Sequence, residues 1–242
     1  MVWRVATVTG ARAETDSART LHLVVPGWPG HLPGQHVDIR LTAEDGYSAT
    51  RSYSIASAPD SHDLEVTVDE LPDGEVSPYL VREVRPGDKL ELRGPIGGWF
   101  VWRPTAPEPV QLLAGGSGLA PLMSMLRTHL AEASRAPMRL LVSARAPAAL
   151  LYRDELAATA HDGRIEVTYA WTREAPAGWP TPPARLDADL LAKSVWPVAD
   201  APTCFVCGPT GFVEAAAGLL TDAGHDARRV RTERFGPTGG SR

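Results

Sequence analysis

The fold is decided by the stretch "VQLLAGGSGLAPLMSML", residues 110–126, in which an apolar run leads through glycines into a second apolar segment. The first part has the length and composition of a buried strand, and the second begins a helical repeat at Leu122, Leu126 and Leu130. Glycines between a strand and a helix let the backbone come close to a phosphate, at a point where the helix dipole favours negative charge. We therefore predict a strand, a glycine-rich loop and a helix here; the loop either faces a phosphate or serves only as a turn.

Strand-like and helix-like segments continue to alternate after this stretch. The further strand candidates are residues 138–145, 164–172, 203–209 and 228–235, and the helix candidates are 119–134, 150–160, 186–195 and 211–224. Such alternation predicts an α/β doubly wound parallel sheet, in which ligands bind at the carboxyl ends of the strands.

The chain before residue 104 has a different pattern. Short runs with period-two alternation are separated by Gly, Pro and Asp, at 19–25, 36–42, 51–57, 64–71 and 88–94, and only 77–84 looks helical. This pattern predicts an N-terminal antiparallel β-barrel. Because the Pro-rich segment 103–109 separates the two patterns, we expect two domains, 1–104 and 105–242.

Composition excludes several classes of protein. The net charge of −5 argues against nucleic-acid binding, and no apolar run approaches the roughly 20 residues of a membrane helix. The start "MVWRVATVTG" resembles a strand more than a signal peptide, and two cysteines are too few for an iron–sulfur site. The seven histidines show no metal-ligand spacing. We expect a cytoplasmic monomer without a metal centre.

The strand candidate "RSYS" carries the first chemistry. Period two places Arg51 and Tyr53 on one face and Ser54 on the other. An arginine suits a diphosphate through bidentate hydrogen bonds, and a tyrosine offers a flat surface to a ring. The alternative is a solvated arginine beside a cross-strand tyrosine.

The segment "PDGEVSPYL", residues 72–80, adds a second phosphate-binding candidate. Gly74 lies in a turn, and Ser77 is expected to cap the helix that follows. A helix start attracts an anionic phosphate, although Ser77 could serve as a cap alone.

Taken in order, "RSYSIAS", "GEVSPYL", "GPIGGWF", "LLAGGSGLAPLMSML", "CGPTGFVEA" and "TERF" resemble the ferredoxin–NADP reductase family over nearly the whole chain. The resemblance implies an FAD-binding barrel followed by an NAD(P)-binding domain. It implies that Arg51 pairs with the FAD pyrophosphate, that Tyr53 packs on the isoalloxazine and that Ser54 hydrogen-bonds near flavin N5. The residues implied to cradle the pyrophosphate are Gly74, Val76 and Ser77.

One residue departs from the family pattern. Asp69 stands where many relatives carry a basic residue, so one pyrophosphate contact is expected to be missing. FAD is still favoured over FMN, because Arg51 and the helix at Ser77 both suit a diphosphate.

In the second half, the family's nucleotide pyrophosphate loop corresponds to "AGGSGLAP". Its implied contacts are Gly115, Gly116, Gly118 and Pro121, where the proline replaces the last glycine of a G-x-G-x-x-G motif. The nucleotide's ribose is expected at the next strand ends, whose residues are Ser143, Arg145, Thr172, Arg173 and Arg185. Residues 172–174 resemble a Ser-Arg-Glu that binds a 2′-phosphate, so NADPH is favoured over NADH; solvated strand-end arginines are the alternative.

The segment "CGPTGFVEA" begins at Cys207, and Cys204 completes a C-x-x-C. Zinc lacks partner ligands, and residues three apart on a strand point to opposite faces, which argues against a redox dithiol. We predict that Cys204 is a core residue and that Cys207 positions the nicotinamide, with Gly208 and Pro209 leaving room for it.

"TERF" supplies the remaining implied residues. The resemblance places Glu233 beside the hydride-transfer site and Phe235 over the flavin, whereas Phe235 could also be an edge-strand core residue.

Together these features predict a flavoprotein reductase that takes hydride from NAD(P)H onto FAD. We expect a separate acceptor, such as a ferredoxin or a Rieske-type or molybdenum enzyme component, because the cysteines do not suffice for a fused iron–sulfur domain. The alternatives are a reductase of free flavin, an electron-transfer subunit of a larger complex, or a non-catalytic nucleotide-binding module.

Overall fold

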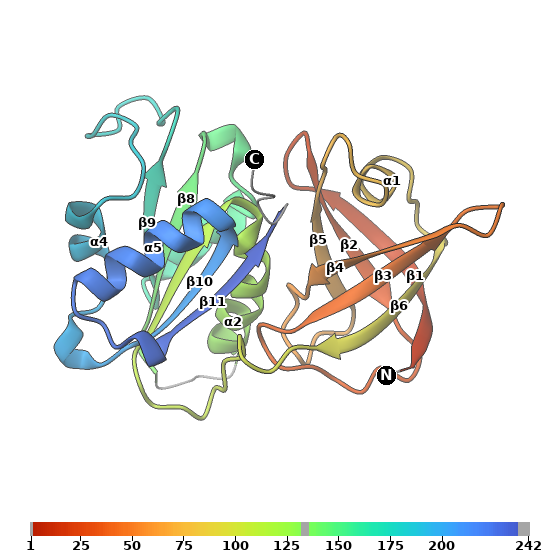
Figure 1. Cartoon of the computed structure of the whole chain (residues 1–242), viewed down its shortest axis with the longest axis horizontal. Coiled ribbons are helices and arrows are strands. Elements are labelled where there is room, and N and C mark those ends of the chain that lie inside the picture. The colour runs from red at the N-terminus through yellow and green to blue at the C-terminus, as the bar shows by residue number, and fades with distance from the viewer. Residues whose placement is uncertain (1, 132–135, 237–242) are drawn as a thin grey trace, which may run out of the picture. The chain divides into compact units, whose positions relative to one another are not determined.

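The computed structural model describes residues 2–131 and 136–236, which form two compact units. The N-terminal unit contains the chain up to Arg103 together with Met123–Ala131. The C-terminal unit contains Pro104–Leu122 and the rest of the chain. Figure 1 shows the strands and helices of each unit.

The N-terminal unit is built on a six-stranded antiparallel sheet with the strand order β4-β3-β6-β1-β2-β5. Its elements are β1 (Trp3–Ala13), β2 (Ala18–Val24), β3 (His36–Thr42), β4 (Ser48–Ser54), β5 (Leu64–Asp69), α1 (Ser77–Arg82) and β6 (Lys89–Ile96). The two outer strands meet where Ile55, just after β4, pairs with Val66 of β5 in an isolated bridge. This bridge closes the sheet into the predicted antiparallel barrel.

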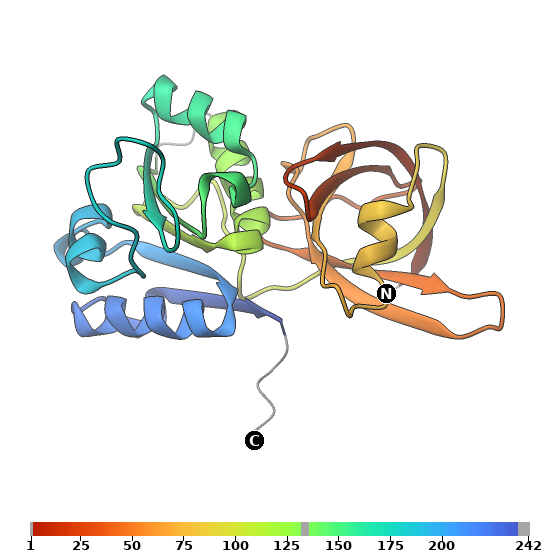
Figure 2. The same ribbon diagram turned by 90° about the horizontal axis from the view of Figure 1, so that it is seen from above.

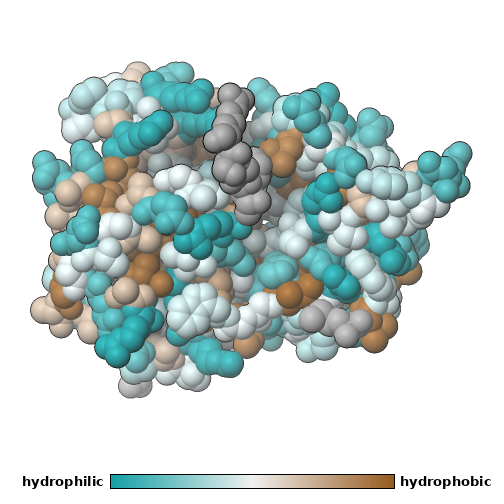
Figure 3. Space-filling model, viewed as in Figure 1, coloured by the Kyte–Doolittle hydropathy of each residue, from teal (hydrophilic) through white to brown (hydrophobic). Residues whose placement is uncertain are grey.

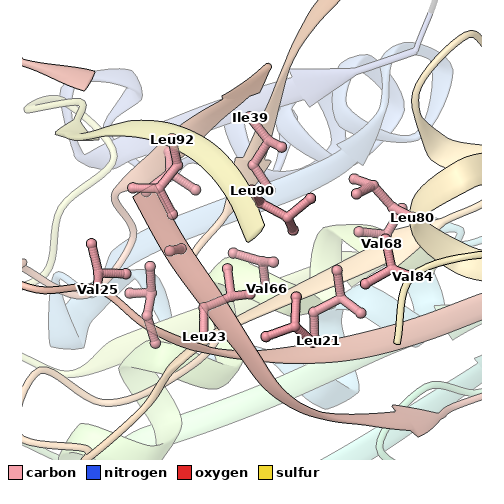
Figure 4. Packing of buried hydrophobic residues seen from close by; sticks show 14 of the residues in the cluster. Leu21, Leu23, Val25, Ile39, Val66, Val68, Leu80, Val84, Leu90 and Leu92 are labelled. Carbon is pink, nitrogen blue, oxygen red and sulfur yellow. The ribbon is translucent and has the colours of Figure 1, made fainter. Parts of the chain in front are cut away.

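Alternate residues of the barrel strands fill its interior. Figure 4 shows leucines and valines of β2, β5 and β6 pointing toward one another, with Leu80 of α1 beside Val68. Leu21, Leu92 and Leu80 have no exposed surface. Each fully buried leucine contributes about 1.5–3 kcal/mol relative to an exposed one. This core therefore stabilises the barrel, whose strand ends carry the candidate site.

The C-terminal unit is built on a five-stranded parallel sheet with the strand order β11-β10-β7-β8-β9. Its strands are β7 (Val110–Gly115), β8 (Met138–Ala144), β9 (Glu166–Trp171), β10 (Thr203–Pro209) and β11 (Val230–Phe235). Its helices are α3 (Arg153–Asp162), α4 (Ala188–Ser194) and α5 (Thr210–Asp222), with 3-10 turns η1 (Gly116–Gly118), η2 (Pro147–Ala149), η3 (Val198–Asp200) and η4 (Ala227–Arg229).

The helices cover both faces of this sheet. Figure 2 shows α3 on one face and the pair α4 and α5 on the other. The sheet grows outward from β7 to β9 and then resumes beside β7 with β10, so the strand order reverses between β7 and β10. In doubly wound sheets this reversal point is where ligands bind, outside the carboxyl ends of the strands.

Helix α2 (Leu119–Ala131) follows η1 directly, and residues 132–134 of the predicted helix lie outside the described residues. Its second half belongs to the N-terminal unit, where Ser124 donates a hydrogen bond of 2.6 Å to the Ser57 carbonyl. Arg127 also pairs with Glu65 of β5 at 2.8 Å.

The apolar residues are concentrated in buried cores, such as the barrel interior and the cluster of β10, β11 and α5 side chains. On the face shown in Figure 3, hydrophobic residues form separate spots among hydrophilic ones. Among residues 2–131 and 136–236, no helix has both the length and the hydrophobicity needed to cross a lipid bilayer.

Candidate functional site

Arg51 lies on the edge strand β4, and its guanidinium is held by the chain itself. Its Nη2 is 2.7 Å from Glu75 Oε2, and its Nη1 donates to the Thr50 carbonyl at 2.8 Å. The other oxygen of Glu75 accepts a hydrogen bond of 2.9 Å from the Tyr47 hydroxyl. About half of each side chain in the Arg51–Glu75 pair is exposed, so the guanidinium is accessible to a ligand.

The Ser77 hydroxyl closes the loop before α1 and does not cap the helix. The Ser77 hydroxyl accepts a hydrogen bond of 3.0 Å from the Leu71 N–H, and the residue at the N-cap position is Val76. The expectation that Ser77 caps the helix was wrong, because its hydroxyl closes the preceding turn instead. A Cβ at Gly74 would lie 2.9 Å from both the Leu71 oxygen and the Ser77 hydroxyl, so only glycine fits there.

This loop offers donors to an anion. Within the described residues, the backbone N–H groups of Glu75, Val76 and Ser77 donate to no acceptor of the chain. Three adjacent N–H groups beside an arginine have the donor chemistry that a diphosphate requires, so the residues present fit the FAD pyrophosphate. The Val76 side chain is buried in the barrel core, which leaves only its backbone for such a contact.

The other flavin candidates lie at the end of β4. Tyr53 packs partly against the barrel core, and burial raises the pKa of its hydroxyl, which therefore stays protonated. Ser54 is partly exposed and lies opposite His36 in the β3–β4 register. Asp69, at the end of β5, accepts a hydrogen bond of 3.0 Å from Ser17.

In the C-terminal unit, Gly115, Gly118 and Gly208 are required by close packing, because none of them has room for a side chain. A Cβ on Gly118 would lie 2.2 Å from the Cys207 carbonyl oxygen. A Cβ on Gly115 or Gly208 would lie 2.6 Å or 2.8 Å from the ring of Phe212, in the first turn of α5. The sequence interpretation assigned Gly115 and Gly118 to the nucleotide phosphates and Gly208 to the nicotinamide. It therefore misses a second constraint: the ends of β7 and β10 meet at closer range than any side chain allows.

Gly116 differs from its neighbours. Its φ is +53°, its residue surface is exposed, and nothing lies within 4 Å of a Cβ placed on it. Of the four loop residues implied to contact the nucleotide, Gly116 is the one that leaves open space, while Gly115, Gly118 and Pro121 are buried.

The two cysteines of β10 are buried free thiols with different surroundings. Cys204 belongs to the core cluster with α5, and burial raises the pKa of its thiol to about 12. Cys207 lies next to Glu233 of β11 in the parallel register, and burial together with that carboxylate raises the pKa of its thiol well above the ordinary value. Both cysteines are therefore protonated thiols at neutral pH.

Glu233 and Phe235 follow one another along β11. Burial raises the pKa of Glu233 from its ordinary value of 4.5 to about 7. Phe235 lies opposite Pro209 in the β10–β11 register and is 36% exposed, so it is no edge-strand core residue. The carboxyl ends of β7, β10 and β11 thus bring the loop, Cys207 and Glu233 to one edge of the sheet.

The ribose candidates lie at the ends of the next two strands. The Arg173 N–H donates to the Arg145 carbonyl at 3.0 Å, and the Ala184 N–H donates to the Trp171 carbonyl at 2.8 Å, which brings the chain back before Arg185. The side chains of all three arginines are exposed, and no carboxylate in the described part of the chain forms an ion pair with them. The remaining candidates at this edge are the buried Ser143 and the partly buried Thr172.

Three residues of these sites escaped the sequence analysis. Glu75 follows a predicted phosphate-loop glycine, and an acid at that position was a usable signal. Phe212 follows the Gly-Pro-Thr-Gly turn and was detectable as a large ring beside small residues. Tyr47 lies near the tip of the β3–β4 hairpin, where no sequence pattern marks it.

A separate cavity of about 100 Å³ lies in the N-terminal unit and is lined by none of the candidate residues. Across the described ranges, no group of three or more His, Cys, Asp or Glu side chains is placed to hold a metal ion.

Comparison with known proteins agrees with this architecture. Residues 7–101 match the family described as the oxidoreductase FAD-binding domain, and residues 112–218 match the oxidoreductase NAD-binding domain. The chain therefore belongs to the oxidoreductases that join an FAD-binding domain to an NAD-binding domain, and ferredoxin reductases are among its neighbours.

Individual relatives extend the match to nearly the whole chain. An NADPH oxidoreductase of Mycobacterium tuberculosis is 35% identical over 94% of this chain and 59% of its own length. The ferredoxin reductase component of 3-ketosteroid-9-alpha-monooxygenase, also from Mycobacterium tuberculosis, is 32% identical over 92% of this chain and 62% of its own length. The chain therefore spans about 60% of the length of these two curated relatives.

Among solved structures, the FAD/NAD-binding domain of nitric oxide dioxygenase from Vibrio cholerae has the same fold. It superposes with a TM-score of 0.86 at 24% identity, covering 97% of this chain and 99% of that one.

Proposed function

We propose that this chain is a flavoprotein reductase that takes hydride from NAD(P)H onto FAD and passes the electrons to a separate redox protein. The observation that carries the proposal is the reversal point between β7 and β10, where the glycine loop and Cys207 lie at one sheet edge. That edge belongs to the NAD-binding part of the chain, and the N-terminal unit carries a matching FAD-binding part. We propose 1–104 as the flavin unit and 105–242 as the nucleotide unit.

In the flavin unit, Arg51 and the backbone N–H groups of Glu75, Val76 and Ser77 would bind the pyrophosphate, with Gly74 shaping the turn that presents them. The Tyr53 ring would pack along the isoalloxazine, and the Ser54 hydroxyl would hydrogen-bond at its reactive edge. A bound flavin supplies the chemistry of accepting a hydride and releasing electrons. The protein's contribution is to orient the ligand and exclude water around it.

In the nucleotide unit, the loop from Gly115 to Pro121 would face the nucleotide pyrophosphate, chiefly at the open Gly116. The Cys207–Pro209 segment would border the nicotinamide, with Phe235 at the end of β11. Because its pKa is about 7, Glu233 would hold or release a proton at this edge at neutral pH.

We further propose that NADPH is the preferred donor. Arg145, Arg173 and Arg185 are exposed and form no ion pair within the described residues, which suits a 2′-phosphate. The M. tuberculosis relative named NADPH oxidoreductase supports the same choice. For the acceptor, the relative named as the ferredoxin reductase component of a monooxygenase supports a ferredoxin or an oxygenase component.

The test is the absorption spectrum of the purified chain. We expect flavin bands that NADPH bleaches without oxygen, faster than NADH does; a colourless protein that takes up no added FAD would falsify the proposal. Arg51→Ala should lower flavin occupancy, whereas Arg82→Ala, which removes an exposed arginine that pairs with Glu70 in the same unit, should not.

The donor preference has its own test. Replacing Arg145 and Arg173 together by Ala should raise the KM for NADPH by at least about tenfold and leave the KM for NADH nearly unchanged. Equal changes for both nucleotides would contradict the 2′-phosphate assignment.

A further inference from the structure

Glu75 is an acid in the loop that the proposed function assigns to the flavin diphosphate. Both of its carboxylate oxygens are engaged: Oε2 lies 2.7 Å from Arg51 Nη2, and Oε1 accepts the Tyr47 hydroxyl at 2.9 Å. Two partners from the β3–β4 hairpin therefore fix this carboxylate in front of Arg51.

Arg51 is correspondingly occupied. Besides its pairing with Glu75, its Nη1 donates to the Thr50 carbonyl at 2.8 Å. The guanidinium has N–H donors to spare, but its charge is offset by a carboxylate at contact distance. A diphosphate bound to Arg51 would also lie close to that carboxylate, and like charges repel.

The surrounding charges do not compensate for this acid. Asp69, at the end of β5, accepts a hydrogen bond from Ser17, and Asp73 lies exposed in the same loop as Glu75. The nearest base on α1, Arg82, pairs with Glu70 at 2.7 Å. A bound diphosphate and the Glu75 carboxylate would therefore compete for the Arg51 guanidinium.

We propose that Glu75 competes with the flavin diphosphate for Arg51 and thereby weakens the binding of FAD to this chain. The inference rests on the proposed flavin function. Because the pair is half exposed, water screens it, and the competition changes affinity by a few-fold rather than by orders of magnitude.

The test uses the full chain freed of flavin and titrated with FAD, with flavin fluorescence as the readout. Glu75→Gln removes the charge and keeps an amide oxygen that accepts the Tyr47 hydroxyl. Asp73→Asn removes the same charge from the same loop, at a residue with no hydrogen bond or ion pair in the described part of the chain. It is the matched control.

We expect Glu75→Gln to lower the Kd for FAD about 3- to 10-fold, to slow FAD release to a similar degree, and to leave riboflavin binding unchanged. Asp73→Asn should change the Kd for FAD by less than about twofold. The gain from Glu75→Gln should shrink as salt is raised from 50 to 500 mM, because the competition is electrostatic.

Unchanged or weaker FAD binding by Glu75→Gln overturns the inference, and so does an equal gain from Asp73→Asn, which would indicate a general effect of net charge. Failure of the proposed function gives a different result: neither the wild type nor any variant binds FAD. That result would refute the flavin function and the role of Glu75 together.

Discussion

The raised pKa of Glu233 leads to a prediction about stability. Glu233 lies on β11 opposite Cys207, and burial raises the pKa of its carboxyl from 4.5 to about 7. Between these two pH values the folded protein holds a proton that the unfolded chain has released. Raising the pH through this window therefore lowers the free energy of unfolding, because the unfolded chain is stabilised by ionising while the folded carboxyl keeps its proton.

The size of the effect follows from the same numbers. Each pKa unit corresponds to about 1.4 kcal/mol, so the shift of Glu233 from 4.5 to about 7 costs the folded state at most about 3.5 kcal/mol above pH 7. At pH 5 the cost is about 1 kcal/mol, since pH 5 lies only half a unit above the ordinary pKa of 4.5. Glu233→Gln removes the ionisation, so its free energy of unfolding should gain about 2.5 kcal/mol on the wild type between pH 5 and pH 8.

The assay is urea unfolding of both proteins at pH 5 and pH 8, followed by tryptophan fluorescence. Glu214→Gln is the control, because it removes an exposed carboxylate that pairs with Arg234 at 2.7 Å and should change stability by less than about 1 kcal/mol at either pH. If the difference between Glu233→Gln and the wild type is the same at both pH values, the reasoning from burial to ionisation cost is refuted.

The remaining predictions concern the carboxyl edge of the parallel sheet. Gly118→Ala should destabilise the chain by at least about 2 kcal/mol in thermal unfolding, because its Cβ would lie 2.2 Å from the Cys207 oxygen; Gly211→Ala, with nothing within 4 Å, should be neutral or stabilising. Cys207→Ser should slow flavin reduction about 10- to 100-fold without changing flavin occupancy, and Cys204→Ser should instead cost about 1–3 kcal/mol of stability; the reverse pattern would contradict the assignment of the two thiols. Neither thiol should react with a thiol reagent at pH 8 in the native protein, because burial raises the pKa of both, whereas two should react after denaturation.

Much of the fold was predictable because strand and helix patterns are local. The strands predicted at 36–42 and 203–209 match β3 and β10 at both ends. The strand predicted at 51–57 was displaced, since β4 runs from Ser48 to Ser54. Its start is set by pairing with Thr42 of β3, and after Ser54 the chain leaves β3 to bridge β5 at Ile55. Both are contacts between distant residues that no local pattern contains.

The candidate site was predictable in its residue types but not in their contacts. The sequence placed Cys204 and Cys207 on opposite faces of a strand, and the structure puts one in the α5 core and the other against Glu233. It assigned Ser77 to a cap, whereas the hydroxyl bonds Leu71, six residues earlier. That choice depends on how the turn closes in three dimensions, which helix-start preferences do not encode.

Phe212 has a consequence for how the nucleotide unit responds to change. Its ring, in the first turn of α5, occupies the space that side chains at Gly115 and Gly208 would need, so it locks the ends of β7 and β10 together. The glycine loop after β7 and the Gly-Pro turn after β10 are separate motifs in the sequence, but both pack against this one ring. Replacing Phe212 by a smaller residue should therefore weaken the packing of both motifs at once. A substitution in one motif that moves this ring also changes the packing of the other.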